Sequence, residues 1–174
     1  MQETELAMRR RLGSSEHNIL ATQGNIADSY LLLGRKEEAL CTTRDVYLGF
    51  LKLYGKEHEE TIRSALCWAF GLHDLRRHEE AKKLLRKTSP VARRVLGETN
   101  ELTLKVRWVY ASVLCDDPAA TLDDLREAVS TLEETARTAR RVLGISHPVT
   151  EGIEAELQIA REDLRARETP SASP

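Results

Sequence analysis

The chain has 174 residues, with 26 Lys and Arg against 28 Asp and Glu, so its formal charge is −2 and no overall field attracts nucleic acid or an anionic membrane. Hydrophobic residues make up 41% and aromatic residues 5%, which predicts one core of ordinary size filled mainly by Ala and Leu. No apolar run approaches the roughly 18 residues of a membrane span, and the chain starts with acidic residues rather than a secretion signal. We therefore expect a cytoplasmic protein.

An apolar residue followed by glycine recurs at intervals of 42, 42 and 47 residues, and a fixed period of this length predicts a repeat architecture. The four pairs are Leu12-Gly13, Tyr54-Gly55, Leu96-Gly97 and Leu143-Gly144. Small and polar residues follow the same period. Two columns are Ala27, Ala69 and Ala111, and Glu38-Ala39, Glu80-Ala81 and Glu127-Ala128; a third is His58, Asn100 and His147, with His17 one residue out of register. The longer third interval is explained by a polar loop inserted at 116–120.

Each unit is predicted to be a first helix (helix A), a tight turn and a second helix (helix B), because the apolar spacing is helical and no alternating strand pattern occurs. The turns are expected at Gly34-Arg35, at 75–77 and in the inserted loop. The fold class is all-α, a right-handed solenoid of helix-turn-helix repeats in one domain, 1–168. Its parts are a half-repeat 1–12, repeats 13–54, 55–96 and 97–143, and a final half-repeat 144–168, followed by a disordered tail, 169–174.

Pro90 contradicts an uninterrupted helix B in the second unit, because proline lacks the amide donor and its ring clashes with the preceding turn. Ser89-Pro90 also resembles a helix cap followed by a first helical residue. We predict a kink or break between Thr88 and Pro90.

The units resemble the 42-residue tetratricopeptide repeat of kinesin light chains. The residues that carry the resemblance are Asn25-Ile26-Ala27-x-x-Tyr30, Gly34-Arg35-x-x-Glu38-Ala39, Tyr54-Gly55-x-x-His58-x-x-Thr61 and Leu143-Gly144-x-x-His147-Pro148-x-Thr150. The resemblance implies a concave groove that holds a peptide and is lined by an asparagine of helix A. Asn25 keeps this asparagine, whereas Cys67, Val109 and Glu156 occupy the equivalent places.

A stack of such units curves because the small rotation between them accumulates, and helix A then lines the concave side. By repeat register we expect eight residues to face this groove: Asn25, Asp28, Arg63, Phe70, His73, Lys105, Trp108 and Ser112. Arg63 and Lys105, one period apart, could hold acidic residues of a peptide while Phe70 and Trp108 offer apolar contact. The alternative is that both cations are solvated helix charges and Trp108 packs in the core.

No enzyme, metal or cofactor is expected. His73 and His78 lie five residues apart across a turn, which does not put two imidazoles on one helical face, and we interpret this stretch as a solvent-exposed turn. His17, His58 and His147 are whole repeats apart and are interpreted as structural. The cysteines are expected to be reduced and buried, since Cys41, Cys67 and Cys115 form no CxxC pair.

The predicted function is a non-catalytic protein-interaction module that binds a peptide or partner segment in the groove. One alternative is a segment of a larger scaffold or cargo adaptor, because the array starts and stops inside a unit, with self-association through the terminal helices. A less favoured alternative is nucleic-acid binding through 82–94, where Lys82, Lys83, Arg86, Lys87, Arg93 and Arg94 occur without an acidic residue but also without interleaved aromatics.

Overall fold

The computed structural model describes residue 4 and residues 15–169, and within these ranges the chain is entirely helical apart from its turns. The helices are α2 (Glu16–Leu32), α3 (Lys36–Tyr54), α4 (Glu59–Asp74), α5 (His78–Leu96), α6 (Glu101–Asp116), α7 (Leu122–Val142) and α8 (Pro148–Glu168). The three predicted turns are confirmed between α2 and α3, α4 and α5, and α6 and α7. The half-repeat 1–12 and the tail lie outside the described residues, apart from residues 4 and 169.

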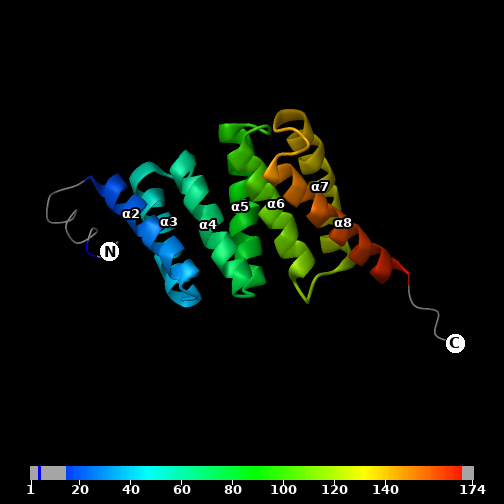
Figure 1. Cartoon of the computed structure of the whole chain (residues 1–174), viewed down its shortest axis with the longest axis horizontal. Helices are drawn as coiled ribbons and strands as arrows, with labels where there is room; N and C mark the ends of the chain where they lie inside the picture. Colours follow the sequence, from blue (N-terminus) through cyan, green and yellow to red (C-terminus); the bar gives the residue numbers. More distant parts are fainter. Residues whose placement is uncertain (1–3, 5–14, 170–174) are drawn as a thin grey trace.

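The helices are stacked in chain order. Figure 1 shows them side by side from α2 near the N-terminus to α8 near the C-terminus. Each helix packs against the next, and α4 also contacts α6 while α6 contacts α8. Contacts between consecutive A helices, combined with contacts between sequence neighbours, are the stepwise packing of a solenoid. The predicted fold class, an all-α solenoid of helix-turn-helix repeats, is confirmed.

The repeated polar residues before each A helix are N-caps. Ser15 caps α2, and His58, Asn100 and His147 accept hydrogen bonds from the backbone amides of Glu60, Leu102 and Val149 at 3.2, 2.8 and 3.3 Å. The first helical turn leaves its amides without partners inside the helix, so an acceptor at this place stabilises the helix start. The interpretation of His58 and His147 as structural is therefore supported, whereas His17 lies inside α2 and contacts the Tyr54 hydroxyl at 3.1 Å.

The small-residue columns lie in the interior of the stack. Ala27, Ala69 and Ala111 are fully buried, as are the column members Ala81 and Ala128. Most buried side chains belong to one continuous core that extends from α3 to α8. Leu20, Val46 and Phe50 instead form a small cluster of their own between α2 and α3. The first described repeat thus has a core that is separate from the rest of the stack.

The break predicted at Pro90 is wrong, because α5 continues as one helix from His78 to Leu96 with Pro90 inside it. Pro90 is exposed, so the carbonyl that loses its helical hydrogen bond faces the solvent side of the helix. Thr88 and Ala92, on either side of it, are buried against the core and hold both halves of α5 in place. Packing outweighs the local preference of proline.

Burial of the cysteines was predicted correctly only for Cys115. Cys41 and Cys67 are exposed on α3 and α4, while Cys115 lies at the buried end of α6. Burial, followed by the negative charge of Glu156, raises the pKa of the Cys115 thiol to about 12. Cys115 therefore remains protonated at neutral pH and behaves as an apolar side chain.

Candidate functional site

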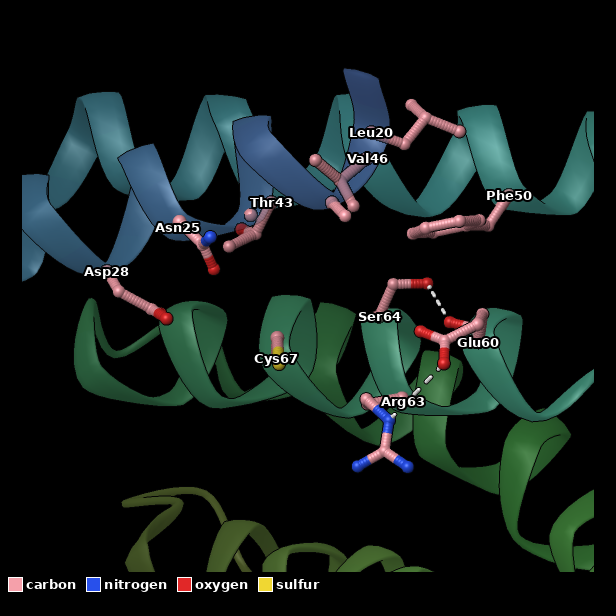
Figure 2. Close-up of a pocket in the computed structure, with 12 residues that line it drawn as sticks. Leu20, Asn25, Asp28, Thr43, Val46, Phe50, Glu60, Arg63, Ser64 and Cys67 are labelled. Carbon is pink, nitrogen blue, oxygen red and sulfur yellow. Dashed lines mark hydrogen bonds and ion pairs between the residues drawn. The ribbon is translucent and has the colours of Figure 1, made fainter. Parts of the chain in front are cut away.

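A pocket opens between α2 and α4, with α3 as its floor. Its volume is about 220 Å³. The side chains of Leu20, Val46 and Phe50 form its apolar base (Figure 2). The rim is polar, with Asn25 and Asp28 from α2 opposite Cys67, Ser64 and Glu60 from α4. Three of the eight residues expected in the groove, Asn25, Asp28 and Arg63, are brought together here.

The pocket exists because α2 and α4 face each other with small or polar residues. On α2 the lining residues near the mouth are Ala21, Gly24 and Asn25, none of which is long enough to fill the gap. Between α4 and α6, in contrast, apolar side chains such as Ile62 and Val106 are fully buried in the common core. The A helices therefore separate at the first repeat junction and pack directly at the later ones.

Gly24 lies in the middle of α2, where close packing does not require a glycine. A Cβ atom built on it meets nothing within 4 Å, because the space above it is part of the pocket. Glycine inside a helix costs about 1 kcal/mol relative to alanine. Gly49 of α3 differs, since a Cβ there would lie 2.4 Å from Cδ2 of Leu20 in the pocket floor. Gly49 is needed for packing, whereas Gly24 leaves open space.

Arg63 and Lys105, one repeat apart, line one hollow together with Glu59 and Glu101. Neither cation is free, however. Arg63 Nη2 lies 2.5 Å from Glu59 Oε1, and Lys105 Nζ lies 2.7 Å from Glu101 Oε1, each carboxylate one helical turn earlier in the same helix. Both cations are about half exposed. Arg63 and Lys105 are therefore better described as solvated helix charges than as unpaired cations available to a ligand. The glutamates four residues earlier in each helix were the sequence signal for this pairing.

The other expected groove residues have different environments. Phe70 is 55% exposed on α4 and is free to contact a partner. Trp108 is half-buried and packs against α8, where a Cβ on Gly152 would lie 2.3 Å from its Cη2 atom. Ser112 is buried and donates a hydrogen bond to the Trp108 carbonyl. Trp108 thus fits the core alternative, and Phe70 remains the exposed aromatic of this face.

The stretch around His73 and His78 is not the solvent-exposed turn that the sequence suggested. His73 Nε2 lies 2.8 Å from Asp116 Oδ2 on α6. His78, the first residue of α5, is only 5% exposed, and its ring meets the His73 ring edge-on with centroids 5.5 Å apart. Neither ring nitrogen of His78 has a hydrogen-bond partner among the described residues. Burial occurs because α4, α5 and the inserted loop meet at this corner, which no local pattern reveals.

The burial of His78 makes stability depend on pH. Desolvation and then the charge of His73 lower its pKa below the ordinary 6.5, while Asp117 and Asp116 oppose the shift and Arg76 adds to it. The unfolded chain therefore binds the proton more readily, so stability is full above about pH 6.5 and falls as the pH drops through the lowered value.

We expect the wild type to lose unfolding free energy between pH 7 and pH 5, and His78→Leu to lose less over the same range. Urea unfolding of both proteins at each pH measures the difference, because the two proteins differ only at residue 78. Parallel pH profiles for the two proteins would contradict this explanation.

The basic run 82–94 is largely neutralised within the protein. Lys82 is buried against Asp117 and Glu79, and Arg86 donates to the Tyr110 hydroxyl at 3.0 Å. Arg93 pairs with Glu98 and Arg94 with Glu57, each at 2.6 Å. Only Lys83 and Lys87 lack such a partner among residues 15–169. This pairing removes most of the charge on which the nucleic-acid alternative depended.

No three His, Cys, Asp or Glu side chains of the described residues converge in a way that could hold a metal ion. No helix within 15–169 combines the length and apolar character needed to cross a bilayer.

Comparison with known proteins agrees with this geometry. The tetratricopeptide repeat family matches residues 120–149, which include α7 and the start of α8. A kinesin light chain-type protein of Podospora anserina with nearly identical TPR-like repeats is 23% identical, with a TM-score of 0.75 over 96% of this chain and 77% of that one. A single-substitution variant of it gives a TM-score of 0.77 at the same identity and coverage. BtubC (BKLC) from P. vanneervenii is 13% identical, with a TM-score of 0.58 over 92% of this chain and 69% of that one.

No curated protein matches the chain at a significant level. The fold and the matched segment define the class, an all-α solenoid built from tetratricopeptide-type repeats. Within this class the structure is similar to that of kinesin-light-chain-like repeat proteins, and the resemblance seen in the sequence is confirmed at the level of the fold.

Proposed function

We propose that the chain is a non-catalytic protein-interaction module that binds a segment of a partner polypeptide along the face formed by its A helices. Repeat solenoids present extended surfaces of this kind to their partners. The pocket between α2 and α4 and the hollow that contains Lys105 share Arg63 as a lining residue, so the two lie next to each other along this face.

The observation that carries the proposal is the open space above Gly24. A Cβ atom at residue 24 would meet no described atom within 4 Å and would favour the helix, so packing does not require glycine there, and we infer that its small size keeps the pocket open. A volume of about 220 Å³ is smaller than the roughly 300–1,000 Å³ of a typical small-molecule site, and it suits a single side chain of a bound segment.

Gly24→Leu tests the proposal because its side chain would fill the pocket while improving the helix. Random peptides displayed on phage are selected on the immobilised chain, and recovered peptides are synthesised and titrated by fluorescence anisotropy. We expect the affinity of these peptides to fall at least tenfold in Gly24→Leu, with thermal stability equal to or above that of the wild type.

Ser130→Leu is the matched control, since it adds the same side chain to an exposed helical position on α7, away from the pocket. Peptides should bind this variant as they bind the wild type. Recovered peptides that bind Gly24→Leu with unchanged affinity, or a selection that recovers no peptide, would contradict the proposed function.

A further inference from the structure

The pocket between α2 and α4 contains a carboxylate that has no partner among the residues the structure describes. Asp28 is exposed at the rim, and no described residue donates a hydrogen bond to it or forms an ion pair with it. Asp28 and Cys67 both line the pocket, Asp28 from α2 and Cys67 from α4. The side-chain amide of Asn25, one helical turn earlier, also has no partner among residues 15–169.

Arg63 does not supply the missing positive charge. Its guanidinium points away from α2 and α3 (Figure 2), where it pairs with Glu59 and lies 3.9 Å from Glu60. Of the charged residues that line the pocket, Asp28 and Glu60 are negative and Arg63 alone is positive. The pocket mouth is therefore negative, and an acidic segment would meet Asp28 without gaining a free cation in return.

The shape of the pocket suits a side chain with a long aliphatic stem and a charged head. Leu20, Val46 and Phe50 offer an apolar base to the stem, and the charged groups Asp28 and Glu60 lie at the rim. Arginine and lysine bury their methylene stems along apolar surface while the charged head stays near polar groups. Arginine has the additional ability to pair with a carboxylate through two parallel hydrogen bonds and to donate a further one to a nearby amide oxygen.

We propose that the pocket binds an arginine side chain of the partner segment, with Asp28 as its counter-ion and the Asn25 amide oxygen as a second acceptor. The inference rests on the proposed function, since it names the chemistry of the partner segment that binds to the face formed by the A helices. A basic anchor residue agrees with three observations. The Asp28 carboxylate has no partner among the described residues, the base of the pocket is apolar, and Arg63 and Lys105 already pair with glutamates.

The test uses the peptides recovered by phage selection, each made in three forms in which the anchor residue is arginine, citrulline or glutamate. Citrulline keeps the shape of arginine but has no charge. We expect the arginine form to bind wild type at least tenfold more tightly than the citrulline form, and the glutamate form to bind more weakly still. The affinity of the arginine form should fall as salt is raised.

Asp28→Asn removes the charge with little change of shape, and Asp123→Asn, at a fully exposed site on α7, is its matched control. We expect Asp28→Asn to weaken the arginine peptide about tenfold and to leave the citrulline peptide within twofold, so that the two changes are not additive. Asp123→Asn should leave both peptides unchanged. In the bound state Cys67 should react more slowly with iodoacetamide, with Cys41 as the exposed reference.

The possible failures can be told apart. Peptides that lose affinity in Gly24→Leu but carry an acidic or uncharged anchor would overturn the arginine inference and leave the proposed function in place. The same follows if Asp28→Asn binds the arginine form as the wild type does. If no recovered peptide depends on Gly24, both the inference and the proposed function fail.

Discussion

Replacing Lys82 by methionine is expected to lower the unfolding free energy by about 3 kcal/mol, because it leaves a buried carboxylate without its counter-charge. The Lys82 ammonium lies 3.0 Å from Asp117 Oδ2 and 2.7 Å from Glu79 Oε1, and the side chains of Lys82 and Asp117 are 9% and 7% exposed. Asp117 in turn accepts the backbone amide of Ala119 at 2.9 Å. This pair attaches the inserted loop to α5, so its loss should also loosen the corner between α5 and α6.

Urea unfolding followed by circular dichroism measures the effect. Lys83→Met is the control, since the neighbouring lysine is exposed, and we expect it to change stability by less than about 0.5 kcal/mol. The double variant Lys82→Met with Asp117→Asn should recover about 1 kcal/mol or more, because the neutral amide still accepts the Ala119 amide and no charge is left buried. A Lys82→Met protein as stable as Lys83→Met would show that the pair contributes nothing.

Enlarging Ala69 to leucine is expected to destabilise the protein by about 2–3 kcal/mol. Ala69 is fully buried on α4, and its repeat equivalents Ala27 and Ala111 are equally inaccessible. Ala69 belongs to the common core, so its methyl group is enclosed by neighbouring protein atoms. A leucine side chain can be accommodated only if neighbouring helices separate or neighbouring side chains leave their preferred rotamers.

Phe70→Leu provides the matched comparison, because it places leucine at the adjacent residue, which is 55% exposed. We expect its stability to stay within about 0.5 kcal/mol of the wild type. Thermal unfolding of the two variants under the same conditions separates a packing effect from any general effect of leucine in α4. Equal melting temperatures would mean that the alanine column does not set the distance between the helices.

Features that recur in the sequence were predicted well. The glycines that end each B helix adopt positive φ values of 81° at Gly55, 90° at Gly97 and 93° at Gly144. Positive φ strongly favours glycine, so the turn is a local property that the residue type reveals. Arg76 shows the limit of this signal, since it adopts φ 60° where the first repeat has Gly34.

Features that depend on neighbours from other helices were predicted poorly. His78 and Cys67 were assigned the wrong exposure, because burial at a corner or at a pocket rim is decided by which helices meet there. The helix break at Pro90 does not occur, since packing on both sides outweighs one lost hydrogen bond. The pairing of Arg63 with Glu59 was within reach of the sequence, because residues four apart on a helix face each other.

For the described residues of this protein, the sequence by itself determined the order and type of the helices and the places where they turn, apart from the break expected at Pro90. It could do so because the signals are local and each is repeated at a constant interval, so one unit supports the assignment of the next. Only the tertiary structure decided where the stack opens, which cations are already neutralised and which carboxylate is unpaired. These properties arise from distances between side chains on different helices, and one sequence records the side chains but not the distances.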